Sequence, residues 1–274
     1  MNKNKITFWG VRGSNPTPDR DKVNYGGHTS CVSLHTYNNE LLIFDMGTGL
    51  RNLGKELISK ADSPKTIHII LSHYHWDHMI GLLSFAPLFS EDFKIHFYGK
   101  KDAMDVKEII SYMMNPVFWP VSFDNFKATL YFHTIKNETF KISNSIDIKT
   151  KLHGHPNGAL SFRVDLNHKI FTYITDCEHP EACLNENLIE LAKNSDILIH
   201  DSHFDSHDLL THKGWGHSSW EQAVLMAKKS ASKQLILFHY NPDYDDEKVK
   251  SIELKAQSNF KQTVAAKQGL VIYL

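Results

Sequence analysis

Short apolar, β-prone runs that each end abruptly at a histidine or an aspartate are the feature that most constrains the fold of this chain. The residues that end them are Asp45, His73 after Ser72, Asp176, His200 followed by Asp201, and His239. Continuous apolar runs of this length, bounded by polar turns, are typical of strands covered on both faces. We therefore expect buried strands over residues 41–44, 67–71, 170–175, 197–199 and 235–238, with their ends meeting at one edge.

Helical patterns lie between several of these runs. We expect helices over residues 50–59, 102–114, 186–193 and 219–231. Ser218 and Glu221 are spaced as a capping box for the last of these helices, and its apolar residues recur at helical spacing. Helices between buried strands predict a layered α/β fold. Because no linker or low-complexity segment interrupts residues 1–274, we expect a single domain.

The composition excludes several classes of function. The 274 residues include 30 Lys and Arg against 31 Asp and Glu, a net charge of -1 that gives no strong nucleic-acid signal. No apolar run reaches the length of a membrane span, and no signal-peptide pattern follows Met1. The three cysteines have no CxxC spacing, so we expect a cytoplasmic protein without membrane contact. The 18 histidines instead favour metal or proton chemistry.

The run from Ser72 to His78 contains the sharpest chemical signal, an HxHxDH motif directly after an apolar run. Its four candidate metal ligands are His73, His75, Asp77 and His78. Imidazoles and carboxylates are the ligands that borderline divalent metals accept. In extended backbone His73 and His75 project to the same side. A turn after Trp76 would send Asp77 and His78 toward a neighbouring position, so the segment can serve two metal ions.

This motif resembles that of the metallo-β-lactamase superfamily, and three later residues match the superfamily's remaining ligand positions. They are His155 in Gly154–Gly158, Asp176, and His239. The resemblance spans most of the chain and implies an α/β fold, an αββα sandwich of two mixed β-sheets flanked by helices. It also implies that one metal ion is bound by His73, His75 and His155 and a second by Asp77, His78 and His239, with Asp176 bridging them.

The resemblance further implies a hydrolase with two divalent metal ions, of which zinc is expected first and manganese or iron accept the same ligands. Two such ions can share a hydroxide that attacks the substrate, and Asp77 then counts among the catalytic residues as well as the ligands. Superfamily members with cysteine in place of Asp176 tend toward β-lactams, whereas aspartate fits phosphodiesters, thioesters and lactones. Strand alternation turns Cys177 away from the metal ions, and we expect a buried apolar thiol there.

Two further segments favour phosphodiesters. Residues 215–219 resemble the histidine motif of the superfamily's phosphodiesterase branch, which includes the tRNA 3′-processing nucleases. This resemblance implies that His217 protonates the leaving oxygen. Residues 8–16, 25–31 and 45–51 resemble a bacterial group described as 3′,5′-cyclic-nucleotide phosphodiesterases. One departure is His28, where we would expect that group to carry asparagine.

Several other polar residues are candidates for supporting the ligands or for holding the substrate. Asp45 and Asp201 can orient ligand side chains, and His28 can hydrogen-bond within its turn. The candidates for binding the non-bridging phosphate oxygens are Arg12, Arg163 and Lys213.

The main hypothesis is a dinuclear metal-dependent phosphodiesterase that acts on a small cyclic phosphodiester, foremost a 3′,5′-cyclic nucleotide, with His217 as general acid. One alternative is a tRNA 3′-processing nuclease, and another is a thioester, lactone or β-lactam hydrolase on the same fold. A non-enzymatic alternative is a metal-centred ligand-binding or sensory module. The aromatic and methionine-rich stretch 100–132 is ordinary core in one interpretation and the surface of a pocket or a homodimer in another.

Overall fold

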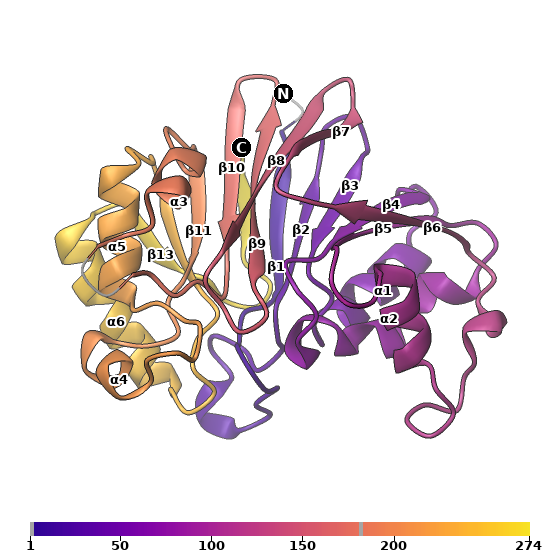
Figure 1. The fold of residues 1–274 in the computed structure, drawn as a ribbon, viewed down its shortest axis with the longest axis horizontal. Helices are drawn as coiled ribbons and strands as arrows, with labels where there is room; N and C mark the ends of the chain where they lie inside the picture. The colour runs from indigo at the N-terminus through magenta and orange to yellow at the C-terminus, as the bar shows by residue number, and fades with distance from the viewer. Residues whose placement is uncertain (1–2, 181–182) are drawn as a thin grey trace. The chain divides into compact units, whose positions relative to one another are not determined.

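The strands of the computed structural model form two mixed β-sheets of seven strands each (Figure 1). The structure describes residues 3–180 and 183–274. Each sheet belongs to one of two compact units. The first unit contains the chain up to Gly10, His28–Lys136 and Gly269–Tyr273, and the second contains Val11–Gly27, Asn137–Gln268 and Leu274. The expected pair of mixed sheets with helices is confirmed, whereas the single domain over residues 1–274 stays a prediction.

The sheet of the first unit has the strand order β14-β1-β2-β3-β4-β5-β6. Its strands are β1 (Lys5–Gly10), β2 (Cys31–His35), β3 (Leu41–Phe44), β4 (Thr66–Ile70), β5 (Lys94–Lys100), β6 (Thr129–Ile135) and β14 (Val271–Tyr273). Strands β3 to β6 are parallel neighbours, and β14, β1, β2 and β3 pair antiparallel. All four apolar residues of β3 are buried, as expected for a strand covered on both faces.

The helices of the first unit are α1 (Leu50–Ser59) and α2 (Val106–Met113), accompanied by the 3₁₀ turns η2 (Trp76–His78), η3 (Ile80–Ser84), η4 (Ala86–Phe89) and η5 (Phe123–Asn125). Helix α1 has the expected bounds. Helix α2 begins later than expected because the Asp105 side chain accepts a hydrogen bond from Glu108 N and forms a capping box there. In the stretch 100–132, Met113 and Met114 are buried while Phe118 is exposed. The homodimer stays a prediction.

The sheet of the second unit has the strand order β13-β12-β11-β10-β9-β8-β7. Its strands are β7 (Thr139–Ser143), β8 (Ile146–His153), β9 (Ala159–Leu166), β10 (Lys169–Ile174), β11 (Ile197–Asp201), β12 (Leu235–Phe238) and β13 (Thr263–Ala265). Strands β10 to β13 are parallel, and β7 to β10 pair antiparallel.

The helical elements of the second unit are η1 (Arg20–Lys22), α3 (Glu186–Leu191), α4 (Ser206–Thr211), α5 (Trp220–Lys229) and α6 (Asp246–Asn259). Helix α5 packs against β11 and β12, and α6 packs against β13 (Figure 1). The buried face of α5 contains Trp220, Ala223, Val224 and Ala227, which is the expected apolar stripe. Among the described residues, no helix is long and apolar enough to cross a membrane.

The five strands expected from the apolar runs are present as β3, β4, β10, β11 and β12. Two of them belong to the first sheet and three to the second. Within each sheet these strands are parallel neighbours, so their carboxyl ends lie at the same edge. The polar residues that follow them are therefore gathered at one edge of their own sheet.

The start of α5 corrects one expectation. The capping box is formed by Ser219 and Gln222, with the Ser219 side chain accepting a hydrogen bond from Gln222 N, and not by Ser218 and Glu221. Ser218 is instead used by the loop before the helix, because its backbone N–H donates to Asp201 Oδ1 at 3.0 Å. Its hydroxyl donates to the Cys177 carbonyl oxygen. A sequence with two adjacent serines satisfies either spacing, and the tertiary contacts decide between them.

Three histidines stack across β4, β5 and β6. The ring centroids of His68 and His96 are 4.9 Å apart, and those of His96 and His133 are 5.3 Å apart. Burial, together with a smaller effect of positive charge on His96 and His133, lowers the pKa of His68 to about 4. The folded protein therefore keeps His68 neutral at pH values where the unfolded chain protonates it.

We expect His68 to contribute to acid denaturation. Because its folded-state pKa is lowered from 6.5 to about 4, stability is complete above pH 6.5 and is lost as the pH falls toward 4. In His68→Gln this loss should be smaller, by about 1–2 kcal/mol, measured as the free energy of unfolding in urea at several pH values. The control is His207→Gln at an exposed position of α4. Identical pH slopes for His68→Gln and the wild type would contradict this assignment.

Candidate metal centre

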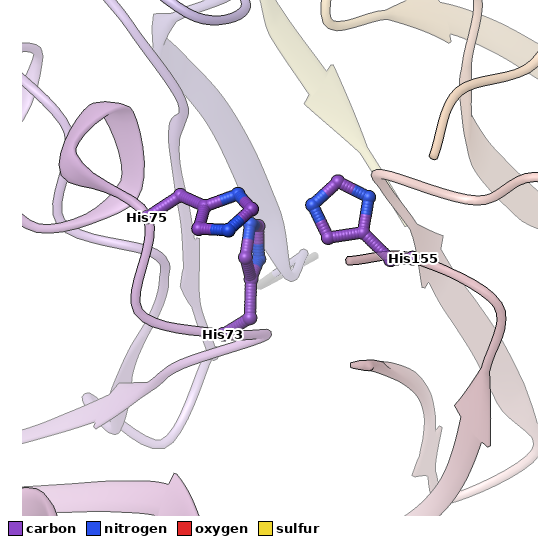
Figure 2. Close-up of side chains that lie close together, drawn as sticks. All are labelled: His73, His75 and His155. Carbon is purple, nitrogen blue, oxygen red and sulfur yellow. The ribbon is translucent and has the colours of Figure 1, made fainter. Parts of the chain in front are cut away.

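The first unit gathers the four residues of the HxHxDH motif directly after β4. His73 and His75 project from the loop that follows the strand, as Figure 2 shows, and Asp77 and His78 lie in the 3₁₀ turn η2. The ring centroids of His73 and His75 are 4.5 Å apart, and those of His73 and His78 are 4.3 Å apart. Asp77 and His78 are buried. Four candidate ligands thus lie within one short segment, at the carboxyl end of a parallel strand.

The contacts of His78 fit a metal ligand. Its Nδ1 lies 2.8 Å from Asp45 Oδ2, so a neutral His78 ring donates from Nδ1 and carries a lone pair on Nε2. That Nε2 faces Asp77 Oδ2 at 3.1 Å, so two hydrogen-bond acceptors point at one another. A divalent ion bound to both would remove this repulsion, and the donor set of the segment therefore fits a metal.

Asp45 holds this segment through hydrogen bonds to Ser72 and His78. The carboxylate is fully buried and accepts hydrogen bonds from Ser72 N at 2.8 Å, from the Ser72 hydroxyl and from His78 Nδ1. Its φ of 60° places it in the left-handed region at the end of β3. Non-glycine residues in this region cost free energy and cluster at functional sites.

The second unit gathers a matching set around Asp176. His155 Nε2 lies 3.7 Å from Asp176 Oδ1, and His239 Nε2 lies 3.3 Å from Asp176 Oδ2. His155 projects from the loop after β8 (Figure 2). Its Nδ1 donates to the Gly216 carbonyl oxygen at 2.9 Å, so in the neutral ring the Nε2 that faces Asp176 is an acceptor. This acceptor pair repeats the arrangement at His78 and likewise fits a bound cation.

Two of these ligand candidates are held in strained backbone. Asp176, directly after β10, has a φ of 52°, and His239, directly after β12, has a φ of 63°. Both side chains are almost fully buried. Because such conformations persist only where the surrounding structure enforces them, the strand ends fix these two ligand positions.

His217 lies beside the residues around Asp176 and is hydrogen-bonded to the buried Asp201. His217 Nδ1 is 3.1 Å from Asp201 Oδ2 and 3.7 Å from Asp176 Oδ1. Burial opposes ionisation of Asp201, but the hydrogen bond and positive charge of His217, with that of His239, outweigh it and lower the pKa of Asp201. The Asp201 carboxylate also accepts hydrogen bonds from the backbone N–H groups of Asp176, His203 and Ser218. The His217 ring is thereby oriented by an ionised partner.

The imidazole of His203 stacks on the face of the His217 ring. The rings of His203 and His217 are nearly parallel, with centroids 4.0 Å apart. Burial lowers the pKa of His203 well below its usual value, and positive charge on His217 lowers it further. His203 donates from Nδ1 to the His239 carbonyl oxygen at 3.0 Å. It therefore acts as a neutral stacking partner that fixes the plane of His217.

Sequence reasoning missed Glu178, which ties two loops of this unit together. Its two carboxylate oxygens accept hydrogen bonds from Gly214 N at 2.8 Å and Gly216 N at 2.7 Å. Gly216 in turn accepts the hydrogen bond from His155 and precedes His217 in the chain. A lone glutamate two residues after Asp176 carries no pattern by itself, because its partners lie far along the chain.

We expect Glu178→Ala to lower kcat/KM for a phosphodiester about 10-fold. Hydrogen bonds to a charged acceptor contribute about 1.5–3 kcal/mol each, and the loop that positions His155 and His217 loses two of them. Steady-state kinetics with metal analysis measures this effect. The control is Glu186→Ala at an exposed position in the first turn of α3. A Glu178→Ala protein with wild-type kcat/KM would show that the loop is held by other contacts.

Three other candidates make contacts within the fold. Arg12 is fully buried, and its guanidinium donates to the carbonyl oxygens of Gly26 and Tyr244 and pairs with Asp246 at 4.0 Å. These contacts hold the guanidinium inside the fold, and a role of Arg12 in substrate binding stays a prediction.

Arg163 and His28 also support the fold. Arg163 donates to the carbonyl oxygens of Leu191 and Lys193 at the end of α3 and pairs with Asp165. His28 Nδ1 lies 3.1 Å from the Thr48 hydroxyl in the turn before α1. A basic residue near the end of a helix satisfies carbonyl groups that have no intrahelical partner, and this explains the position of Arg163.

Comparison with known proteins identifies the class to which this fold and these ligand sets belong. Residues 42–240 match the model of the beta-lactamase superfamily domain, which is well over half of the chain. The chain therefore belongs to this superfamily, and it is a metal-dependent hydrolase.

The chain is also similar to individual members over nearly its whole length. It is 25% identical to the ribonuclease Z of Thermoplasma acidophilum, in an alignment that covers 96% of this chain and 94% of that protein. Its fold matches the metallo-beta-lactamase fold protein YhfI of Bacillus subtilis with a TM-score of 0.74, 19% identity and complete coverage of both chains. The short form of human tRNase Z matches with a TM-score of 0.69 and 20% identity over 98% of each chain. These solved structures confirm the metallo-β-lactamase fold.

Proposed function

We propose that this chain is a dinuclear metal-dependent phosphodiesterase whose substrate is a small cyclic phosphodiester, foremost a 3′,5′-cyclic nucleotide. The proposal depends on the hydrogen bond between His217 and the buried carboxylate of Asp201. The same His217 nitrogen, Nδ1, lies 3.7 Å from Asp176 Oδ1. An imidazole oriented in this way can hold a proton for the leaving oxygen of a phosphodiester. Thioester hydrolysis has less need of such a group, because a thiolate can depart without a proton.

The proposed ligand set follows the motifs of the superfamily. One ion would be held by His73, His75 and His155, the other by Asp77, His78 and His239, with Asp176 shared. Divalent ions at these residues would supply a nucleophile at neutral pH and neutralise negative charge on the phosphate. The nitrogen and oxygen donors suit zinc, and they also suit manganese or iron.

The chain's own residues perform the remaining steps in this proposal. Asp45 holds the His78 ring with Nε2 available to a metal ion. Asp201 orients His217 and stabilises its protonated form, so that His217 can donate the proton to the departing ribose oxygen. His203 fixes the plane of the His217 ring by stacking. Asp77 would contribute as a metal ligand and, as a buried carboxylate, as a hydrogen-bond acceptor.

The charge of the chain favours a small substrate. With 30 basic and 31 acidic residues, it lacks the excess of positive charge that binds a polyanion such as tRNA. A cyclic nucleotide carries a single phosphodiester and requires no such surface.

A second candidate is a tRNA 3′-processing nuclease. The whole-length similarity to a ribonuclease Z favours it, since the name of that relative states an action on RNA. The two candidates use the same bond chemistry and differ in the size of the substrate. Fold alone does not separate them.

Metal analysis of the purified protein, combined with hydrolysis assays, tests whether the protein cleaves phosphodiester bonds. The substrates are cyclic purine and pyrimidine nucleotides, a generic phosphodiester, a thioester and a β-lactam. We expect metal-dependent turnover of the phosphodiesters and none of the other two. Turnover of the thioester or the β-lactam with inert phosphodiesters would contradict the proposal. Binding of nucleotides without turnover of any substrate would instead favour a ligand-binding module.

A further inference from the structure

A buried group of one cysteine and three histidines lies in the second unit and shares no residue with the ligand set above. We call it the Cys177 cluster; it consists of His153, Cys177, His179 and His200. Cys177 Sγ lies 3.8 Å from His179 Nδ1 and 3.9 Å from His179 Nε2. Each of Cys177, His179 and His200 offers one sulfur or ring-nitrogen atom, and these three atoms all lie within 4.8 Å of one another. The His179 and His200 rings are stacked with centroids 5.5 Å apart.

The polar atoms of this cluster are poorly satisfied by the fold. Both ring nitrogens of His153 and Nε2 of His200 are buried and have no hydrogen-bond partner within residues 3–180 and 183–274. His200 donates from Nδ1 to the Asp201 carbonyl oxygen at 2.7 Å, so in the neutral ring its Nε2 carries a lone pair. Leaving a buried polar atom without a partner costs about 1–3 kcal/mol, which makes such atoms in a native core informative.

His153 is the fourth member of the cluster. It interacts with His179 and with His200, and all three histidines are at most 6% exposed. Three imidazoles and a thiol enclosed together have the donor types of a closed four-coordinate metal site. Thiolate sulfur and imidazole nitrogen together select borderline-soft ions, of which Zn²⁺ is the natural one in a site without redox function.

We propose that Cys177, His179 and His200, with His153 as the fourth ligand, bind a Zn²⁺ ion that is separate from the phosphodiesterase centre. Binding replaces the Cys177 S–H proton, which leaves to solvent, with a sulfur–zinc bond and involves no oxidation or reduction. Because Cys177 follows Asp176 and His200 precedes Asp201, this ion would tie together the ends of β10 and β11. It would thereby stabilise the strand ends that carry those two carboxylates.

One hydrogen bond competes with this site. Asn185 N donates to His179 Nδ1 at a long 3.3 Å, and coordination through Nε2 would shift a proton to Nδ1 and release that N–H. Asn185 and His179 both line a surface pocket together with Gly154 and Pro180. Water in this pocket can accept the released N–H, and the pocket gives an ion a path to the cluster.

Spectroscopy on the full-length protein tests the site without reference to activity. The phosphodiesterase centre proposed above has only nitrogen and oxygen donors, so a sulfur signal reports the Cys177 cluster alone. We expect a thiolate-to-metal charge-transfer band in the near ultraviolet after loading with Co²⁺. We also expect zinc X-ray absorption of the wild type to show a sulfur neighbour at about 2.3 Å. Metal-loaded wild-type protein without either signal would overturn the proposal, whether or not any variant folds.

Variants then assign the sulfur. Cys177→Ser should lose the charge-transfer band and one equivalent of bound zinc, whereas Cys183→Ser, at an exposed cysteine, should keep both. His75→Ala removes a ligand of the proposed phosphodiesterase centre and should leave the sulfur signal intact. A sulfur signal that persists in Cys177→Ser would place the ion at another cysteine and overturn the proposal. Failure to hydrolyse phosphodiesters would leave the sulfur result unaffected, so the two proposals fail separately.

Discussion

Replacing His217 with alanine is expected to lower kcat for a cyclic nucleotide by about 10²–10⁴-fold while the bound metal is retained. The alkoxide of a ribose is a poor leaving group, and without His217 it departs without a proton. The ring is held by Asp201 and stacked on His203, so its removal deletes a single oriented proton donor and no proposed metal ligand. Steady-state kinetics and metal analysis of the same preparation measure both quantities.

The leaving group separates this role from a structural one. A nitrophenyl phosphodiester releases a stable anion that needs no proton, so His217→Ala should lose much less activity on it than on a cyclic nucleotide. His207→Ala, at an exposed position of α4, is the matched control and should retain both activities. Equal losses on the two substrates, or loss of the metal, would make His217 a ligand or a structural residue and contradict its role as proton donor.

Replacing Asp45 with asparagine is expected to weaken metal binding by about 10–100-fold, the usual effect of removing a carboxylate that orients a ligand histidine. The carboxylate accepts from Ser72 N through one oxygen and from His78 Nδ1 through the other. An asparagine amide has one oxygen, so its NH₂ group meets either Ser72 N–H or His78 Nδ1–H. Turning the NH₂ group toward His78 would move the ring proton to Nε2, where it blocks coordination.

Asparagine also isolates this effect from the backbone. It tolerates the left-handed φ of 60° at this position better than most residues, so the turn after β3 should persist. Metal affinity is measured by competition with a chromophoric chelator, and Asp62→Asn, at an exposed aspartate, is the control. Wild-type affinity in Asp45→Asn, with the protein folded, would show that the His78 tautomer does not depend on Asp45.

Much of the fold follows from local sequence. The run Leu41–Phe44 is buried as β3 with the expected bounds, because four consecutive apolar residues leave no polar face for a solvent-exposed strand. The polar residues after β10, β11 and β12 share a sheet edge because these strands are parallel neighbours. Polar residues that directly follow apolar runs therefore indicate, from the sequence alone, which side chains share a sheet edge.

The support of the site was less accessible, because it depends on partners far apart in the chain. The sequence does not show that Arg12 is buried and donates to the carbonyl oxygens of Gly26 and Tyr244. Glu178 shows no motif, and its two hydrogen bonds reach residues more than thirty positions away. Such contacts arise from tertiary packing, which a single sequence does not report.

Cys177 illustrates the same limit more sharply. It is buried, as expected, in the loop after β10. The sequence gives no indication that His153, from β8, and His200, from β11, meet it there. These residues come from different strands, and the order β11-β10-β9-β8 brings them together.

Assays of two substrates with one metal-loaded preparation distinguish a cyclic-nucleotide phosphodiesterase from a tRNA 3′-processing nuclease. The kcat/KM values for 3′,5′-cyclic nucleotides and for a precursor tRNA with a 3′ extension are determined side by side, with His217→Ala as the background. We expect His217-dependent turnover of a cyclic nucleotide and no specific cleavage of the tRNA precursor. Specific 3′ cleavage of the precursor, with cyclic nucleotides left intact, would contradict this expectation.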